Sequence, residues 1–529
     1  MDELLLIPIL LPSVIGILLL VSSFREHRKE APAVETPDIK APAIGGSTNP
    51  EEVNTSADPG RFSADQRRRL SVIVMTVLSV SAVTAMLLAW TGDRSLTLFR
   101  LVEDIPVMFR VDSLGKLLVT IISVIWLAAG IYSLKYMDHE GDEKRYFGFY
   151  LLLYGVLVAQ DFAGNLITMY LFYELVTVVS FPLVLHNNSR ESIMAALKYL
   201  FYSICGAYGG LFGIFFLYRY SPSLTFQAGG VLGTVAQGHE GILLIAVFAM
   251  LVGFGAKAGM LPLHAWLPAA HPVAPSPASA VLSGIIVKAG VLAVIRVIYY
   301  VVGPGFIRGT WVQYAWMTLS LLTVFMGSLL AYREKVFKKR LAYSTVSQVS
   351  YILFGLSLLT PVGFTGALLH VAAHAVIKCG LFLTAGVFLY HFGYNRVGQL
   401  VGMGKKMPAV MWCYTIFSLG LIGIPPTAGF ISKWYLAQGS LQSDTGVFSW
   451  LGPVVLLISA LLTAGYLLPI TMKGFFPGEE ADYLDLKRKE PSPCMLLPLI
   501  FLAAATLILG LLPGSLIEYA SKIAGAVLG

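Results

Sequence analysis

A lysine stands within a long apolar stretch, five residues before a proline. The stretch covers residues 253–272, and the two residues are Lys257 and Pro262. A proline inside a helix removes a backbone hydrogen bond and clashes with the preceding turn. In hydrocarbon, the freed carbonyl groups are tolerated only against protein or a water-filled cavity. A helix that breaks beside a buried charge is typical of sites that bind or move ions across a membrane.

Other ionisable side chains also lie within long apolar stretches. Each such side chain costs about 2.5–3.5 kcal/mol on insertion scales, so a whole set of them is not expected without a function. The candidates for proton transfer are Glu174, Lys257, Lys288 and Lys433, the relay candidates are Lys198, His264, His271, His370, His374 and Lys378, and the predicted helix breaks are Pro262, Pro425 and Pro426. His370, His374 and Lys378 are spaced by four residues, which places them on one face of a helix.

These residue types suit proton handling. Burial in a low-dielectric medium favours the neutral form of a lysine, and a nearby carboxylate favours the charged form. If Glu174 pairs with Lys257, moving the carboxylate away favours release of a proton from the lysine. Histidine, whose unperturbed pKa is about 6.5, is a suitable relay between such groups.

Structural roles remain open for each of these residues. Glu174 can serve as an ion-pair partner, and the lysines can extend from helix ends towards the membrane surface, Lys198 above all. His370 and His374 can be packing residues, and their spacing alone also allows a metal site, for which the sequence offers no third ligand. Arg296 is expected to reach an interface.

The elements that must position these residues are membrane-spanning helices. Of the 529 residues, 56% are hydrophobic and 13% are charged, about half the charged share of a soluble protein. The fold class is therefore predicted to be an all-α polytopic membrane protein with about fourteen transmembrane helices. The apolar stretches cover residues 4–23, 70–90, 113–134, 145–161, 163–185, 191–218, 240–269, 275–302, 309–332, 340–359, 363–391, 409–438, 447–472 and 493–515.

The domain organisation follows from these stretches. We expect a first transmembrane helix in residues 1–23, a polar linker at 24–69, helices 2 and 3 at 70–134, one repeat at 145–302, a second at 309–472, and a last helix with a tail at 493–529. Five helices in each repeat (helices 4–8 and 9–13) give consecutive units opposite orientations, the inverted arrangement of many transporters. Helices 7 and 12 are the broken ones.

The distribution of Lys and Arg predicts the orientation. With the N-terminus outside, the inner loops hold 24 of these residues, and the outer loops and tail hold six. Both termini are then expected to face outward, and the 24–69 linker, rich in Pro, Glu, Ala and Ser, to be cytoplasmic and flexible. The net charge of +7 is explained by this loop bias, so nucleic acid is not an expected partner. The four cysteines lack metal-ligand spacing, and no cofactor-binding motif is present.

Several motifs, in a fixed order, resemble one known family. They are YEL at 173–175, AKAGMLPLHAWLPAAH at 256–271, PSPASA at 275–280, VKAGV at 287–291, LAYSTVSQ at 341–348, HVAAHAVIK at 370–378 and GIPPTAGFISK at 423–433. The chain resembles the antiporter-like subunits of respiratory complex I, of Mrp-type Na⁺/H⁺ antiporters and of membrane-bound [NiFe] hydrogenases. The match covers roughly residues 110–475.

The resemblance implies fourteen core helices in two inverted repeats. It also implies that Glu174 and Lys257 form the pair of the first half-channel, that Lys288 is the bridging lysine and that Lys433 is the terminal lysine near the outer exit. Some members have a glutamate at that last position, so the lysine favours the Mrp-like and hydrogenase-like branches. The insert at 24–69 is not part of the family pattern.

The expected function is ion translocation, by proton pumping or Na⁺/H⁺ antiport, within a multi-subunit complex of the cell membrane. Expected partners are antiporter-like and small helical membrane subunits, H⁺, Na⁺ in the antiport case, and the lipid bilayer. If the complex is redox-driven, peripheral subunits carry iron–sulfur and nickel–iron centres, and none belongs to this chain. Redox-driven pumping and secondary antiport stay open, and the alternatives are a solute permease or a non-transporting membrane scaffold.

Overall fold

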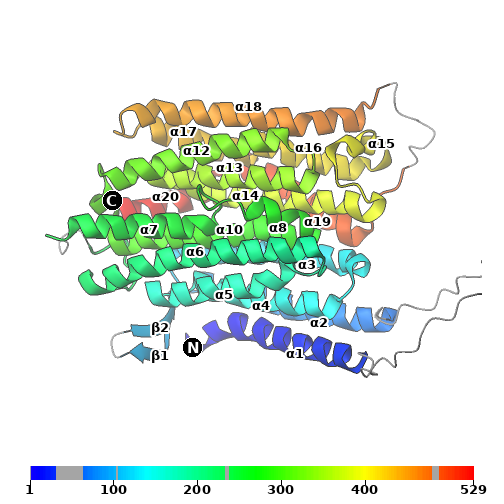
Figure 1. Cartoon of the computed structure of the whole chain (residues 1–529), viewed down its shortest axis with the longest axis horizontal. Helices are drawn as coiled ribbons and strands as arrows, with labels where there is room; N and C mark the ends of the chain where they lie inside the picture. The colour runs from blue at the N-terminus through cyan, green and yellow to red at the C-terminus, as the bar shows by residue number, and fades with distance from the viewer. Residues whose placement is uncertain (1, 31–62, 103–104, 233–237, 479–487) are drawn as a thin grey trace, which may run out of the picture.

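A computed structural model describes residues 2–30, 63–102, 105–232, 238–478 and 488–529. Within these residues the chain forms a bundle of long helices that lie side by side, with a β-hairpin at one end (Figure 1). Eleven helices of the described part are long and apolar enough to cross a membrane. The predicted all-α polytopic fold class is confirmed, and the count of fourteen spans and the inverted repeat stay predictions.

The helices before the first break are η1 (Asp2–Leu6), α1 (Ile7–Glu30), α2 (Ala64–Trp90), α3 (Ser113–Glu140), α4 (Glu143–Asp161), α5 (Leu166–Val184), α6 (Arg190–Tyr220) and α7 (Glu240–Lys257). Then come α8 (Leu267–Val273), α9 (Ser276–Val281), η2 (Leu282–Ile286), α10 (Val287–Ile295), η3 (Arg296–Val302), α11 (Pro304–Ile307), α12 (Trp311–Arg333), α13 (Phe337–Ser357) and α14 (Pro361–Phe392). The last are η4 (Val397–Leu400), α15 (Met403–Lys406), α16 (Pro408–Ile422), α17 (Ala428–Leu441), α18 (Val447–Phe475), α19 (Pro493–Leu511) and α20 (Gly514–Leu528). The strands are β1 (Ser95–Val102) and β2 (Ile105–Arg110), which pair antiparallel.

Two elements were not expected from the sequence. The hairpin β1–β2 lies between two predicted helices, and the C-terminal tail is the helix α20. The buried residues of α20 are Ala520, Ile523, Ala524 and Val527, a helical spacing that packs one face against α14. Around the predicted linker, α1 continues to Glu30 and α2 begins at Ala64, and residues 31–62 lie outside the described residues.

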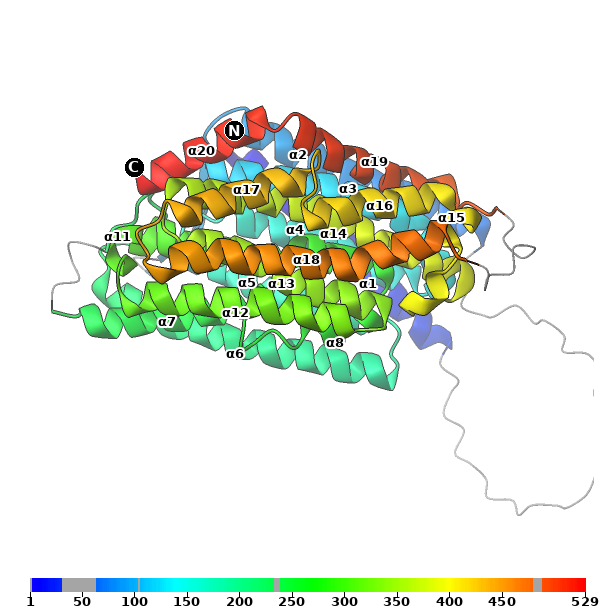
Figure 2. The same cartoon turned by 90° about the horizontal axis from the view of Figure 1, so that it is seen from above.

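The interior of the bundle is formed by two spans. The most apolar stretches of Ser276–Val302 and of Pro361–Phe392 are completely buried. Other spans cover them, and Figure 2 shows α18 lying across one face between α12 on one side and α16 and α17 on the other. The two buried spans carry Lys288, His370, His374 and Lys378, so these charges belong to the most enclosed part of the bundle.

Both predicted helix breaks are present, and each contains a glycine with positive φ. After α7, Gly259 has φ +78°, and a Cβ atom at this position would lie 2.3 Å from a Leu267 side-chain carbon. After α16, Gly423 has φ +90°. Glycine adopts this backbone conformation without the steric cost that other residues incur. The predicted prolines lie inside the two breaks, at 262 and at 425–426, where no helix continues.

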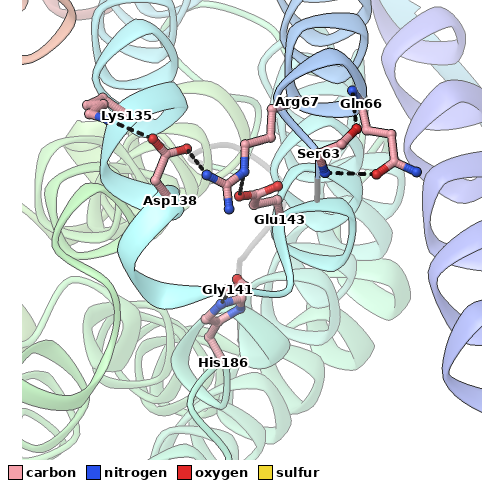
Figure 3. Close-up of polar contacts among 8 residues, drawn as sticks. All are labelled: Ser63, Gln66, Arg67, Lys135, Asp138, Gly141, Glu143 and His186. Carbon is pink, nitrogen blue, oxygen red and sulfur yellow. Dashed lines mark hydrogen bonds and ion pairs between the residues drawn. The ribbon is translucent and has the colours of Figure 1, made fainter. Parts of the chain in front are cut away.

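Both chain ends lie at the same end of the bundle as the hairpin (Figure 1). At the opposite end, an ion-pair network ties α2 to α3 and α4 (Figure 3). Arg67 of α2 lies 3.6 Å from Asp138 of α3 and 3.0 Å from Oε1 of Glu143 of α4, and Lys135 lies 2.8 Å from Asp138. Glu143 is 5% exposed, and its burial raises the pKa of its carboxyl group although Arg67 lowers it.

We expect Arg67→Ala to lower the free energy of unfolding by about 1–3 kcal/mol, because it leaves the Glu143 carboxylate buried without a cation. A carboxyl group whose pKa is raised on folding favours the folded state below its unfolded pKa and loses this contribution as the pH rises through the folded pKa. The difference in free energy of unfolding between the wild type and Arg67→Ala should therefore shrink as the pH is lowered from 7 towards 4. Thermal unfolding of both proteins in detergent micelles across this pH range measures this difference.

The matched control is Arg69→Ala, which breaks the exposed 2.8 Å pair between Arg69 and Asp65 on the same helix. Exposed pairs contribute about 0–1 kcal/mol, so this variant should melt close to the wild type. If the two variants lost the same free energy of unfolding, the burial of Glu143 would add nothing to the contribution of its ion pair.

Candidate functional site

Lys257 is the last residue of α7 and is completely buried at the first helix break. Its Nζ donates hydrogen bonds to the backbone carbonyl of Tyr173 (2.6 Å) and to Oγ1 of Thr177 (2.8 Å), both on α5. Nζ also lies 3.6 Å from the centre of the Tyr173 ring, where a cation is attracted to the π face. The ammonium group is thus held by neutral acceptors that tolerate both its charged and its neutral form.

Glu174 follows Tyr173 on α5 and is half-buried. Its Oε1 is buried and has no hydrogen-bond partner. Within the described residues, Glu174 and Lys257 form no ion pair shorter than 4.0 Å, although Lys257 bonds the residue next to Glu174. The structure therefore places the two residues of the predicted pair close together without direct contact.

Lys288 and His374 are joined directly at the centre of the bundle. Nζ of Lys288 lies 2.6 Å from Nδ1 of His374, and it donates a second hydrogen bond to the carbonyl of Ser283 at 3.0 Å. Ser283 belongs to the π-helical segment η2, a kind of irregularity that is frequent at functional sites. Both side chains are buried, and Nε2 of His374 has no hydrogen-bond partner. Two nitrogens at this distance are within reach for the transfer of one proton.

His370 continues this line by one helical turn along α14. Its ring centre lies 6.1 Å from that of His374, and its ring stacks on Tyr351 at 5.5 Å. Nδ1 of His370 lies 2.9 Å from Oγ of Ser432 on α17, and Nε2 has no partner. The histidine pair thus connects Lys288 to the helix that carries Lys433.

Lys433 lies on α17 at the second helix break. Its Nζ donates hydrogen bonds to the carbonyls of Leu421 (2.6 Å) and Ile422 (2.8 Å), the last residues of α16. These carbonyls have no partner within their own helix, and the C-terminal end of a helix attracts a positive charge. Nζ also lies 5.1 Å from the centre of the Tyr351 ring, on which His370 stacks.

Lys378, the third residue on this face of α14, is also completely buried. Its Nζ donates to the carbonyl of Leu341 (3.0 Å) and to Oγ of Ser344, both on α13. We call Lys257, Lys288, His374, His370, Lys378 and Lys433 the buried row.

Among the described residues, none of the other relay candidates is hydrogen-bonded to the buried row. Lys198 is exposed on α6, with its Nζ 6.0 Å from the Tyr202 ring. His264 is half-buried in the first break, with Nδ1 unbonded. His271 is completely buried and stacks on Phe382 at 4.7 Å, and neither of its ring nitrogens has a hydrogen-bond partner.

A second group of buried charges was not expected from the sequence. Arg296 is 1% exposed and binds Asp112 through both of its terminal nitrogens, and its expected position at an interface of the membrane stays a prediction. Asp161, the last residue of α4, is 3% exposed. Lys338 is also buried and donates to the carbonyls of Pro272 and Ala274. Asp112, Asp161 and Lys338 adjoin ends of apolar stretches, where the sequence suggests exposure and only packing reveals burial.

The buried row joins the two helix breaks through the interior. Helix α10 packs against α7, Lys288 of α10 contacts His374 of α14, and α14 packs against α17, so contacts run from one break to the other. Among the described residues no three His, Cys, Asp or Glu side chains gather to hold a metal ion, which leaves His370 and His374 without a third ligand. The arrangement can exchange protons between groups that are hydrogen-bonded or one turn apart.

Two family models match the chain. Residues 163–463 match the model described as NADH:quinone oxidoreductase/Mrp antiporter, TM, and residues 102–147 match the one described as NADH-Ubiquinone oxidoreductase (complex I), chain 5 N-terminus.

Curated relatives and solved structures agree with this match. The NADH-quinone oxidoreductase subunit N of Desulforudis audaxviator is 32% identical over 414 residues, which cover 76% of this chain and 81% of the relative. A Na⁺/H⁺ antiporter subunit of Bacillus subtilis is 29% identical over 454 residues, which cover 85% and 86%. A chain of the membrane-bound sulfane sulfur reductase, an archaeal respiratory membrane complex, shares the fold with a TM-score of 0.81 at 20% identity, over 100% of this chain and 98% of that one.

Proposed function

Because the chain belongs to the membrane-subunit family shared by NADH:quinone oxidoreductases and Mrp antiporters, we propose that it translocates ions within a multi-subunit membrane complex. The transported ion is the proton, which is relayed along the buried row. Exchange of H⁺ for Na⁺ and pumping driven by a redox reaction in partner subunits are both compatible with this role, since the two kinds of complex share this type of subunit.

The observation that carries the proposal is the contact between Lys288 and His374. It lies in the most enclosed part of the bundle, where charges are expensive and where a structural role would leave them with an opposite charge as partner. Here a lysine contacts a histidine instead. If both side chains were charged they would repel each other, so the contact implies that at most one of them is charged at a time and that they share protons. Such groups titrate as a coupled set.

The roles follow the order of the buried row. Glu174 modulates the charge on Lys257, Lys288 passes the proton to His374, His370 continues the relay, and Lys433 is the last carrier before the exit. Lys378 extends the row on the opposite side of His374 along α14, and His271 is a further relay candidate. Lys198 is exposed in this chain, so it can act in the relay only if a partner subunit covers it.

A solute permease is the less favoured function. Broken helices bind substrates through free backbone groups at their ends. Here the carbonyls at the end of α16 are already bonded to Lys433, and Lys257 occupies the other break. A membrane scaffold would not need the Lys288–His374 contact.

Replacement of Lys288 tests the proposal. We expect Lys288→Met, which keeps the length of the side chain but cannot hold a proton, to lower ion flux by about a hundredfold in vesicles that contain the complete complex. The matched control is Lys522→Met, which removes an exposed lysine of α20 and should leave flux unchanged. Wild-type flux in assembled Lys288→Met would exclude a relay through the bundle centre.

Partner subunits and cofactors form the finer part of the proposal. The partners are antiporter-like and small helical membrane subunits, together with the lipid bilayer. If the complex is redox-driven, peripheral subunits carry iron–sulfur and nickel–iron centres. The nickel and iron content of the purified complex separates this case from secondary antiport.

The proposed orientation in the cell membrane has both termini outside and the 24–69 segment in the cytoplasm. We expect protease added to sealed inside-out vesicles to cut this segment, because the positive-inside bias places it on the cytoplasmic side. Right-side-out vesicles serve as the control and should protect it. Cleavage in intact right-side-out vesicles would reverse the proposed orientation.

A further inference from the structure

A surface pocket of about 420 Å³ lies where α12 ends and α13 begins. Its volume is within the range of about 300–1,000 Å³ that is usual for small-molecule sites. The pocket is open to the surface, and its walls come from the α12–α13 loop and from the loop after α14. Its charged walls are Arg333, Glu334, Lys335 and Arg396, and its apolar walls include Leu330 and Tyr343. We call it the basic pocket.

Backbone hydrogen bonds hold the two loops of the basic pocket together. The N–H of Val397 donates to the carbonyl of Lys335 at 3.0 Å, and the N–H of Phe337 donates to the carbonyl of Asn395 at 2.8 Å. These bonds flank an antiparallel bridge at Arg396. The loop after α14 therefore holds its arginine beside the basic residues of the loop after α12.

The acid of the basic pocket already has partners. Oε2 of Glu334 lies 3.0 Å from Nζ of Lys339, and Oε1 accepts hydrogen bonds from the N–H groups of the next two residues at 2.9 and 3.0 Å. Arg340 donates to the backbone carbonyl of Glu334 at 2.8 and 2.6 Å and to the carbonyl of Tyr466 on α18 at 2.8 Å. These contacts fix the loop, and Lys339 neutralises the carboxylate.

The other three charges of the basic pocket have no counter-ion. Arg333, Lys335 and Arg396 are exposed, and within the part of the chain that the structure describes none of them forms an ion pair. An anion in the basic pocket would therefore meet three unpaired cations. Phosphate suits this set, because a guanidinium binds two of its oxygens at once and an ammonium group binds it as a point charge.

An exposed apolar face of α12 leads to the basic pocket. Arg333 is the last residue of α12, which is long and apolar enough to cross a membrane. Leu322, Phe325 and Tyr332 are 53%, 42% and 51% exposed, and their helical spacing places them on one face. The basic pocket thus lies where this span leaves the hydrocarbon, the level at which tyrosines and basic residues contact lipid headgroups.

We propose that the basic pocket binds the phosphate group of an anionic phospholipid, whose acyl chains lie along the exposed face of α12. A free phosphate would leave this apolar face unused. A zwitterionic lipid carries a cation of its own, which the three basic side chains repel. The site lies outside the buried row and adds a lipid-binding role to the proposed ion translocation.

A photoreactive lipid tests the site directly. The complete complex is placed in phosphatidylcholine nanodiscs that contain a small share of phosphatidylglycerol with a photoreactive acyl chain, and mass spectrometry locates the labelled residues. We expect labelling on the exposed face of α12. The triple variant Arg333→Gln, Lys335→Gln, Arg396→Gln should lower it by about tenfold or more, because each basic residue near an anionic headgroup contributes about fivefold.

The matched control removes three exposed basic residues from other loops that are predicted to face the same side. In Arg25→Gln, Arg68→Gln, Arg190→Gln the basic pocket is intact, so labelling of α12 should stay at the wild-type level. An equal loss in the two triple variants, or no loss in the pocket variant, would overturn the proposal.

Three measurements on the wild type decide the question even if the pocket variant does not assemble. More unlabelled phosphatidylglycerol in the nanodiscs should displace the probe, inorganic phosphate in the buffer should not, and the same photoreactive chain on phosphatidylcholine should label α12 several-fold less. Displacement by inorganic phosphate would show a free-phosphate site instead. An unlabelled α12 would show that a partner subunit covers this face. Either result overturns the proposal, and neither depends on ion flux.

Discussion

Lys257→Met is expected to reduce driven ion transport by about a hundredfold or more while the complex still assembles. The wild-type Nζ is completely buried and held by a carbonyl, a hydroxyl and the face of Tyr173, so its loss removes the protonatable amine from the centre of this break. Methionine fills the same space without a titratable group. Glu174→Gln should give a comparable loss, because it keeps the shape of the side chain and removes the carboxylate whose Oε1 is buried without a partner.

Ion flux in vesicles, with assembly checked by native gel, measures both variants. Glu191→Gln on α6 is a matched control for Glu174→Gln, because it removes an exposed carboxylate and should transport normally. Wild-type flux by Glu174→Gln would mean that Lys257 works without a carboxylate partner.

The sequence predicts the fold class and the breaks because both depend on local chemistry. Apolar length marks the spans, and the pairs Gly259 with Pro262 and Gly423 with Pro425 interrupt helices by their own backbone geometry. The four-residue spacing of His370, His374 and Lys378 likewise fixes a shared face, and the structure shows all three buried on α14.

The partners of the candidate residues could not be predicted in the same way. The sequence suggests a carboxylate for Lys257, but the structure supplies Tyr173 and Thr177, since the nearest acceptors depend on how α5 packs against the end of α7. Lys198 differs from Lys288, because it lies nearer the start of its span and is exposed on α6. The Arg296–Asp112 pair joins residues 184 positions apart, which no spacing rule reveals.

Lys433→Arg is expected to be inactive, and Lys433→Glu is expected to keep partial activity. The lysine bonds the two last carbonyls of α16, a position that also suits a purely electrostatic role at a helix C-terminus. An arginine can make the same bonds and keeps its charge, but it cannot release a proton. A glutamate can gain and lose a proton, so it remains a titratable carrier. It donates to one of these carbonyls only while it is protonated.

The two roles of Lys433 therefore predict opposite orders of activity. An electrostatic cap at the end of α16 is served by arginine and harmed by glutamate, whereas a proton carrier is lost with arginine and partly kept with glutamate. Lys473→Arg, on an exposed lysine of α18, is the matched control for the arginine substitution and should be fully active.

Proton flux through the reconstituted complex, compared between Lys433→Arg and Lys433→Glu at equal amounts of assembled protein, tests most directly whether the buried row carries protons. A relay that ends at Lys433 predicts no flux above background for Lys433→Arg and measurable flux for Lys433→Glu. Full flux through Lys433→Arg would contradict it, because a side chain that never loses its proton would then stand at the last step of the proposed path.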